Sequence, residues 1–401
     1  MIFSLLRRNS NFRLLYIGQF VSFLGTMITS VALPYEVYHE TQSTLMVGLI
    51  SLFQLLPLLV TALMGGVLAD RYHRRTLLLI SEIALALGCL VLACNATLTT
   101  PLIWLIFLAA TVMSALTGLH RPALDSIAQQ IVSPNDFPAL SILANFKFNA
   151  CLIVGPAVGG LIIAYLGIAT TFMADFVSFI VAVISLFLMK DIPKPQTTQD
   201  QSAFSALREG FQYAITRQEL LGTYFVDFIA MVFTMRQALF PAMAETYGGV
   251  KTLGLFYSAV AVGGLCVTFL SGWLMRIKRH GAGVAISALL CGVAMVGFGL
   301  ATHLFEALFF LSLFGALDGA SGIFRQTMWN TIIPNHYRGR LAGIEMIGYM
   351  SGPKLGDTEA GLAAAVLGVT GSIVSGGILC IVGVAVCAYF LPRFWQYTSK
   401  V

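Results

Sequence analysis

The sequence contains few charged residues. Asp, Glu, Lys and Arg make up 10% of its 401 residues, whereas 58% are hydrophobic. A soluble domain has about 25% charged residues. So few charges cannot cover an aqueous surface, and most side chains must therefore face lipid or other helices. The composition predicts a polytopic membrane protein.

Paired cysteines and common catalytic motifs are also missing. The seven cysteines lie singly in apolar runs without CxxC spacing, which argues against a disulfide framework and a metal site. The six histidines are dispersed. The patterns HExxH, GxSxG and GxxxxGK[ST] do not occur. We therefore expect no enzyme, no cofactor, no bound metal and no ATP-driven pump.

Long apolar runs recur along the whole chain. A spanning helix needs about 20 residues, and twelve runs qualify: 12–36, 45–69, 76–97, 102–130, 139–164, 169–190, 219–243, 252–276, 281–302, 306–332, 341–365 and 368–391. The predicted fold class is an all-α polytopic membrane protein. Its twelve transmembrane helices form two pseudo-symmetric six-helix bundles.

A polar segment separates the two bundles. We expect an N-terminal bundle over 1–190, a cytoplasmic linker over 191–217 and a C-terminal bundle over 218–401. The linker starts with the polar, proline-containing run DIPKPQTTQDQ. Its second part predicts a short amphipathic helix on the cytoplasmic surface, because one apolar stripe recurs there at spacings of three and four: Phe204, Leu207, Phe211 and Ile215.

The basic residues predict the orientation. Seventeen of the 23 Lys and Arg residues fall in segments on the side of the N-terminus, Lys251 alone falls in a loop on the other side, and five lie within spans. This asymmetry follows the positive-inside rule, with both termini cytoplasmic. The basic N-terminal residues therefore precede an uncleaved first span. The net charge of +5 is a topology signal, and no nucleic acid is expected as a partner.

The two halves repeat each other. GLHR, ending at Arg121 in the fourth apolar run, matches GIFR, ending at Arg325 in the tenth. SGWLMRIKRHG after the eighth run takes the place of GGVLADRYHRR after the second. Internal repeats of this kind are typical of secondary transporters, whose substrate site lies between the repeats.

GVLADRYHRR at residues 66–75 resembles the loop motif G-x-L-x-D-R-x-G-R-R of the major facilitator superfamily. The match covers Gly66, Leu68, Asp70, Arg71, Arg74 and Arg75, and it departs at His73, where the family has glycine. The resemblance implies a conformational latch made by Gly66, Asp70, Arg71, Arg74 and Arg75. In the family the acidic residue faces the N-terminal end of helix eleven, which here begins near Arg338 and whose dipole favours a carboxylate.

A second motif lies in the fifth apolar run. Gly155, Pro156, Gly159 and Gly160 resemble the G-P-x-x-G-G motif of exporters in this superfamily. The proline bends its helix, and the glycines permit tight packing.

Two longer stretches, RPALDSIAQQIVSPNDFPALSILANF and TIIPNHYRGRLAGIEMI, are similar to the drug:proton antiporter branch that contains the bacterial enterobactin and other siderophore exporters. This resemblance implies a monomer in the bacterial inner membrane. It implies proton-coupled siderophore export by alternating access.

Ionisable side chains inside apolar runs are the candidate functional residues, because each costs at least about 2.5–3.5 kcal/mol to insert. Five cations favour an anionic substrate, since Arg binds carboxylates through paired hydrogen bonds: Arg121, Lys147, Arg236, Arg325 and Lys354. Asp125 and Asp357 lie within one turn of Arg121 and Lys354, so these two pairs can also be structural.

Three acids are candidates for proton coupling, because burial favours the protonated carboxyl group: Asp227, Asp318 and Glu345. The same acids would attract a cationic drug, and a structural ion pair remains equally consistent with each. A multidrug or macrolide-type efflux pump and an importer of a siderophore or similar anionic ligand therefore stay open. A membrane scaffold would not require so many buried charges.

Overall fold

The computed structural model describes residues 4–190, 203–274, 276–334 and 337–398. These residues are helical with short connections, and no strand occurs among them. The polar linker run DIPKPQTTQDQ falls outside the described residues. The helices group into two compact units, one made of residues 1–42 and 53–200 and the other of residues 43–52 and 201–401. The start of α3 therefore groups with the second unit.

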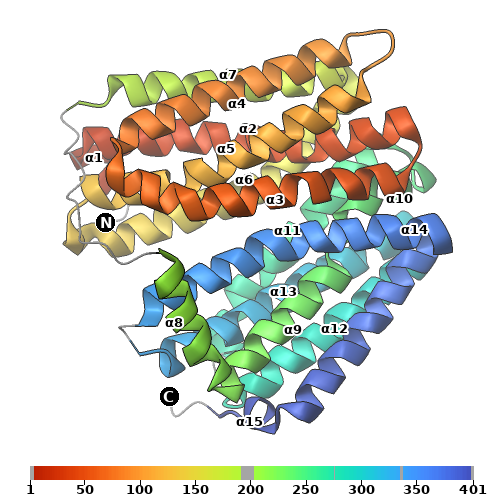
Figure 1. The fold of residues 1–401 in the computed structure, drawn as a ribbon. Helices are drawn as coiled ribbons and strands as arrows, with labels where there is room; N and C mark the ends of the chain where they lie inside the picture. Colours follow the sequence, from red (N-terminus) through yellow and green to blue (C-terminus); the bar gives the residue numbers. More distant parts are fainter. Residues whose placement is uncertain (1–3, 191–202, 275, 335–336, 399–401) are drawn as a thin grey trace. The chain divides into compact units, whose positions relative to one another are not determined.

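The first unit consists of six long helices and one short helix (Figure 1). In chain order they are α1 (Ser4–Arg8), α2 (Ser10–Thr41), α3 (Thr44–Arg71), α4 (Arg74–Ala96), α5 (Ile103–Ile131), α6 (Phe137–Leu166) and α7 (Ile168–Leu188). Each of the six long helices contains an apolar segment long enough to cross a membrane. Helix α2 packs against α6 and α7, and α4 packs against α5 and α7.

The second unit contains the remaining helices (Figure 1). They are α8 (Ala203–Ile215), α9 (Gln218–Thr234), α10 (Phe240–Thr246), α11 (Val250–Leu274), α12 (His280–Leu300), α13 (Leu304–Ile332), α14 (Arg338–Phe390) and α15 (Pro392–Trp395). Helix α13 packs between α11 and α12, and α14 packs against both α9 and α12.

The described residues contain eleven helical segments suited to span a membrane, because the last two predicted spans are joined in α14. This helix has 53 residues, which would extend about 80 Å if straight, against a hydrocarbon core of about 30 Å. Gly368 interrupts it with φ 75° and ψ 169°. A glycine tolerates this positive φ, so the chain can turn between the predicted spans 341–365 and 368–391.

The seventh predicted span, 219–243, is not one continuous helix. Helix α9 ends at Thr234, and α10 begins at Phe240. Arg236 lies in the break, with φ −104° and ψ 52°. Its buried ion pair, described below, holds the chain in this non-helical conformation, a tertiary effect that apolar periodicity does not report.

A short helix, α8, occupies the second part of the predicted linker. Helix α8 contacts α14 and α9 through buried Ala214 and half-buried Tyr213. Phe211 and Ile215 of the predicted stripe are exposed. The side chains of Phe204 and Leu207 lie outside the described part of the chain.

Small residues allow close helix packing in the first unit. A Cβ added at Gly155 or Gly159 of α6 would collide with Met27 or Ile28 of α2. Gly25 of α2 lies equally close to Ser178 of α7. Van der Waals contact between closely approaching backbones is a main source of helix association in lipid. The predicted tight packing of the fifth-span motif is therefore confirmed.

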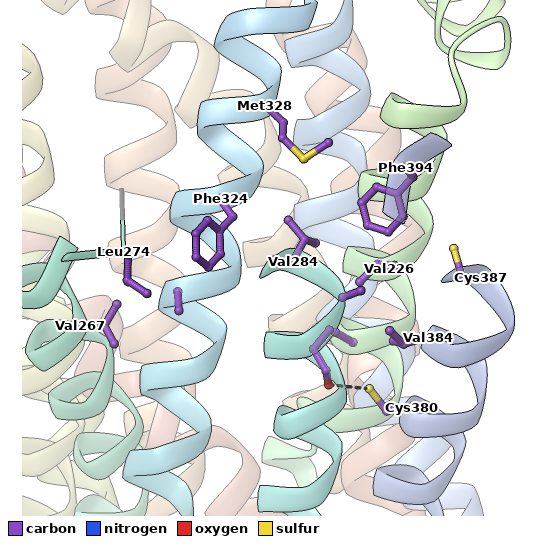
Figure 2. Packing of buried hydrophobic residues seen from close by; sticks show 14 residues of the cluster. Val226, Val267, Leu274, Val284, Phe324, Met328, Cys380, Val384, Cys387 and Phe394 are labelled. Atoms are coloured by element: carbon purple, nitrogen blue, oxygen red, sulfur yellow. Dashed lines mark hydrogen bonds between the residues drawn. The ribbon is translucent and has the colours of Figure 1, made fainter. Parts of the chain in front are cut away.

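The core of the second unit gathers side chains from five spanning segments and from the C-terminal α15. Figure 2 shows Val226, Val284, Phe324 and Val384 in this cluster, together with Phe394 of α15. Phe394 is fully buried against Gly222 of α9, and its carbonyl lies against Gly281 of α12. The short C-terminal helix therefore closes one end of this unit.

Candidate transport site

An ion pair joins α13 to α9 in the second unit. The Arg325 guanidinium donates through Nη1 to the Asp227 carboxylate. Both side chains are 15% exposed, so the pair is largely shielded and not completely enclosed. The two residues lie on different helices, and each is the ion-pair partner of the other.

Aromatic rings lie beside this pair. The Arg325 guanidinium lies 5.6 Å from the centre of the Trp329 ring, one turn along α13. Tyr224 of α9 packs on Trp329 at 5.4 Å between ring centres. The Trp329 Nε1–H donates to Thr223 Oγ1 at 2.9 Å. The cation is thus held between a carboxylate and an indole face, an arrangement that can bind a flat anionic group through charge and stacking.

The other two predicted acids lie near the same pair. Asp318 of α13 and Glu345 of α14 each interact electrostatically with Arg325 and with Asp227. The structure therefore brings Asp227, Asp318, Glu345 and Arg325 together in one unit, although they come from three helices. This group contains three carboxyl groups and one fixed cation.

The Arg236 side chain makes its hydrogen bonds and its ion pair to groups of the second unit. Its three guanidinium nitrogens donate to the Phe233 carbonyl, to Ser372 Oγ at 2.7 Å and to the Glu359 carboxylate at 2.5 Å. A side chain at Gly376 would fill the space that the guanidinium occupies. Each of the three nitrogens thus has a protein acceptor, and the side chain is 0% exposed, which argues for a structural contribution.

Lys354 and Asp357 lie one turn apart on α14, as predicted. Asp357 accepts the backbone N–H of Ala238 at 2.8 Å, next to the break after α9. Lys354 interacts electrostatically with Asp357. The carboxylate thus fixes the backbone of the η2 turn (Gln237–Leu239), which argues for a structural contribution.

The two predicted cations of the first unit differ in their surroundings. Arg121 of α5 pairs with Asp125 at 3.9 Å, and both side chains are more than half exposed. Lys147 of α6 lies 5.8 Å from the centre of the Phe23 ring, which stacks on Phe148. Lys147 also interacts electrostatically with Arg121 and Asp125. These two cations therefore belong to one charged group on α5 and α6.

A buried network around Glu82 of α4 was not predicted. Its side chain is fully buried, and its Oε1 contacts His120 Nε2 of α5 at 2.8 Å and accepts from Gln19 Nε2 of α2 at 2.6 Å. Its Oε2 accepts from Ser22 Oγ at 3.3 Å. The repeat GLHR and GIFR therefore places a cation-capable side chain against a carboxyl group in both units, but in the first unit this side chain is His120 and not Arg121.

Two further buried acids were also missed. Asp175 of α7 accepts from Thr29 Oγ1 at 2.6 Å, from Ser178 Oγ at 3.0 Å and from Cys89 Sγ at 3.3 Å. Glu36 of α2 is 1% exposed, and neither carboxyl oxygen has a hydrogen-bond partner within the described structure. Each is a single acid in an apolar run, the same signal that identified Asp227.

The comparisons with known proteins decide the family. The family described as transmembrane secretion effector, within the major facilitator superfamily, matches residues 3–399. The chain belongs to this family. It is a multi-pass membrane protein of the transporter class, as its composition and its spanning helices predicted.

Curated relatives match this secretion effector over nearly its whole length. Proteins named enterobactin exporter EntS from Shigella boydii serotype 18 and from Escherichia coli O1:K1 are each 26% identical over 402 residues. The alignments cover 99% of this chain and 96% of each relative.

Solved structures of other transporters share the fold. A POT family transporter in complex with 5-aminolevulinic acid superposes with a TM-score of 0.77 at 11% identity, covering 96% of this chain and 97% of the other. A bacterial homologue of the human lysosomal transporter Spinster, in an inward-facing structure, gives a TM-score of 0.74 at 14% identity, covering 98% of each chain. At these identities the likeness establishes the fold alone.

The loop motif of the secretion effector is partly described. Arg74 donates to the Ser126 carbonyl and to Gln130 Oε1, both at 3.3 Å, and Arg75 donates to the Phe187 carbonyl at 2.9 Å. Both arginines therefore bind helix ends within their own unit. The side chains of Gly66, Asp70 and Arg71 lie outside the described residues.

The backbone conformation at His73 explains why this position of the motif does not require glycine. It precedes α4 with φ −63° and ψ 113°, a conformation open to any L-residue. The turn does not need the positive φ that would favour glycine.

Proposed function

We propose that this secretion effector exports a siderophore or a similar anionic small molecule across the bacterial inner membrane by alternating access, with protons as the coupling ion. The observation that carries the proposal is the Arg325–Asp227 pair beside Trp329. The names of the relatives, enterobactin exporters at 26% identity over almost the full chain, support the same cargo class.

The ion pair suggests how the cargo is held and released. A carboxylate or catecholate group of the cargo competes with Asp227 for the Arg325 guanidinium, because both are anions that seek the same donors. Release of the cargo lets the Arg325–Asp227 pair form again. Asp318 and Glu345 add negative charge nearby, which favours release of an anionic cargo.

The proposed orientation follows from the charge distribution. Both termini and the basic loops lie in the cytoplasm, according to the positive-inside rule. The exporter-type motif around Pro156 supports outward transport. The protein is expected to work as a monomer, with the lipid bilayer and the cargo as its partners and without a cofactor.

One observation favours a second candidate. Three carboxyl groups against one arginine in the second unit would suit a cationic amphipathic drug. A multidrug pump would therefore bind cargo through Asp227, and neutralising that residue would abolish binding. In a siderophore exporter the same change frees Arg325 and preserves anion binding.

The test measures extracellular enterobactin in iron-starved bacteria that lack their own exporter. The wild-type chain should restore secretion, and Arg325→Ala should abolish it. Arg325→Lys should restore part of it, since lysine keeps the charge but not the paired donors. Arg276→Ala removes an exposed arginine and should secrete like the wild type.

Three outcomes would contradict the proposal. Secretion that does not change when the chain is present would remove the cargo. Efflux of a fluorescent lipophilic cation that depends on Asp227, without anion transport, would establish the drug pump instead. Transport into right-side-out vesicles, rather than into everted ones, would indicate an importer.

A further inference from the structure

Polar positions on α2 recur every seven residues, and each brings a buried carboxyl group into the first unit. Ser22 bonds to Glu82. Thr29 bonds to Asp175. Glu36 is itself the third carboxyl group. Seven residues are nearly two helical turns, about 10 Å along the axis. The three carboxyl groups therefore follow one face of α2 at regular intervals.

The number of polar partners of these three acids falls along α2, from Glu82 to Asp175 to Glu36. Glu82 contacts His120, which can be a cation, and two neutral donors. Asp175 has hydroxyl and thiol donors, and no ion pair to it occurs among the described residues. Glu36 has no hydrogen-bond partner within the described structure, and the charged group that faces it is Glu40, a like charge.

A buried carboxylate without a counter-ion is strongly unfavourable, and such a group binds a proton instead. Glu36 and Asp175 meet this condition, because each is 1% exposed. Glu82 is 0% exposed and contacts His120, a side-chain type that itself binds and releases protons. Each of the three sites can therefore hold a proton.

We propose that Glu36, Asp175 and the Glu82–His120 pair are successive proton-binding sites along α2. His120 connects the innermost carboxyl group to an accessible surface, because its side chain is 14% exposed while that of Glu82 is 0% exposed. Steps of about 10 Å are longer than a hydrogen bond, so protons pass between sites through intervening water. The proposal rests on the proposed function only in taking these protons as the coupling ions.

The charged and titratable groups around the line are few. Lys147 of α6 interacts electrostatically with Glu82, as does Asp175 of α7. Cys89 of α4 faces Asp175. A positive charge at one end and like charges along the line bias protons to leave at the Glu82 end.

Infrared spectroscopy tests the sites without any cargo. The full-length protein in lipid vesicles is compared in acidic and alkaline buffer, and the carbonyl band of protonated carboxylic acids is recorded in H₂O and D₂O. The wild type should show this band with a deuterium shift. Glu36→Gln and Asp175→Asn should each remove part of it. Glu245→Gln, which changes an exposed carboxyl group, should leave it intact.

A band that is unchanged in Glu36→Gln or in Asp175→Asn would overturn the proposal. The same vesicles then test coupling with enterobactin as the probe. Glu36→Gln and Asp175→Asn should lose accumulation driven by a pH gradient and should retain exchange of labelled for unlabelled probe. Variants that keep gradient-driven accumulation would contradict the proposal. Absence of enterobactin exchange in the wild type would instead remove the proposed cargo and leave the infrared result standing.

Discussion

The two units bury ionisable groups in opposite ways. The second unit pairs its buried acids with arginine, as in Arg325–Asp227 and Arg236–Glu359. The first unit surrounds Asp175 with hydroxyl and thiol donors and places Glu82 against a histidine. Arginine stays charged in proteins, whereas histidine changes its charge near neutral pH. This difference supports the two proposals, anion binding in the second unit and proton binding in the first.

The largest expected effect concerns the charged pair of the second unit. Arg236→Met leaves Glu359 without its counter-charge, and breaking a buried pair in this way costs about 3–5 kcal/mol. The thermal unfolding midpoint in detergent should fall sharply. The double variant Arg236→Met with Glu359→Leu should recover much of the loss. Equal stability of the wild type and Arg236→Met would mean that the Arg236–Glu359 ion pair does not stabilise the second unit.

A smaller effect is expected at Gly25, where the first unit packs tightly around the buried Asp175. A Cβ at Gly25 would lie 2.7 Å from Ser178 Cβ and would also collide with Asp175. Gly25→Ala should therefore destabilise the protein by about 1–3 kcal/mol, as other overpacked sites do. Gly322→Ala in α13 has no atom within 4 Å, and it should stabilise by up to about 1 kcal/mol because alanine favours the helix. Thermal unfolding of both variants would measure this, and a harmless Gly25→Ala would contradict the packing.

The third prediction separates a protonated acid from an ionised one. If the Asp175 carboxyl group is protonated, as we propose, Asp175→Asn replaces it with a neutral group of similar shape, and the neighbouring hydroxyls can rotate to satisfy it. We expect a loss of about 1 kcal/mol or less in chemical unfolding. A loss as large as that of Arg236→Met would show that Asp175 is ionised and would remove the contrast between the units.

The smallest effect is expected at the exposed pair. Arg121 and Asp125 are 3.9 Å apart and more than half exposed, so Arg121→Gln should change stability by about 0.2–1 kcal/mol. High salt should reduce this difference further. If secretion nevertheless falls strongly in Arg121→Gln while unfolding does not change, Arg121 binds cargo and the first unit also holds anions.

Much of the fold could be predicted from the sequence, because hydrocarbon imposes simple rules. Apolar length located the spanning segments, and the glycines around Pro156 indicated tight packing. The break at Arg236 could not be predicted, since it depends on an ion pair to Glu359, 123 residues away. The sequence predicted the apolar stripe of α8. It did not predict what the stripe faces, because the spacing of apolar residues does not say which surface they contact.

The site was predicted less completely than the fold. The five cations were candidates because each lies inside a predicted spanning helix. The same argument applies to the buried acids of the first unit, which were not among the candidates. Glu82 and Asp175 interrupt apolar runs as clearly as Asp227 does. The choice of His120 over the adjacent Arg121 depends on which side of α5 faces α4, a fact that only packing determines.

The position of Phe394 has a consequence for biosynthesis. Its ring fills the space beside Gly222 on α9, yet it is encoded after every spanning segment. The helix ends that Phe394 covers therefore stay uncovered while the ribosome is still translating the second unit. A truncated polypeptide that lacks Phe394 would expose the apolar surface that this ring covers. Membrane proteases and chaperones recognise incomplete products by surfaces of this kind.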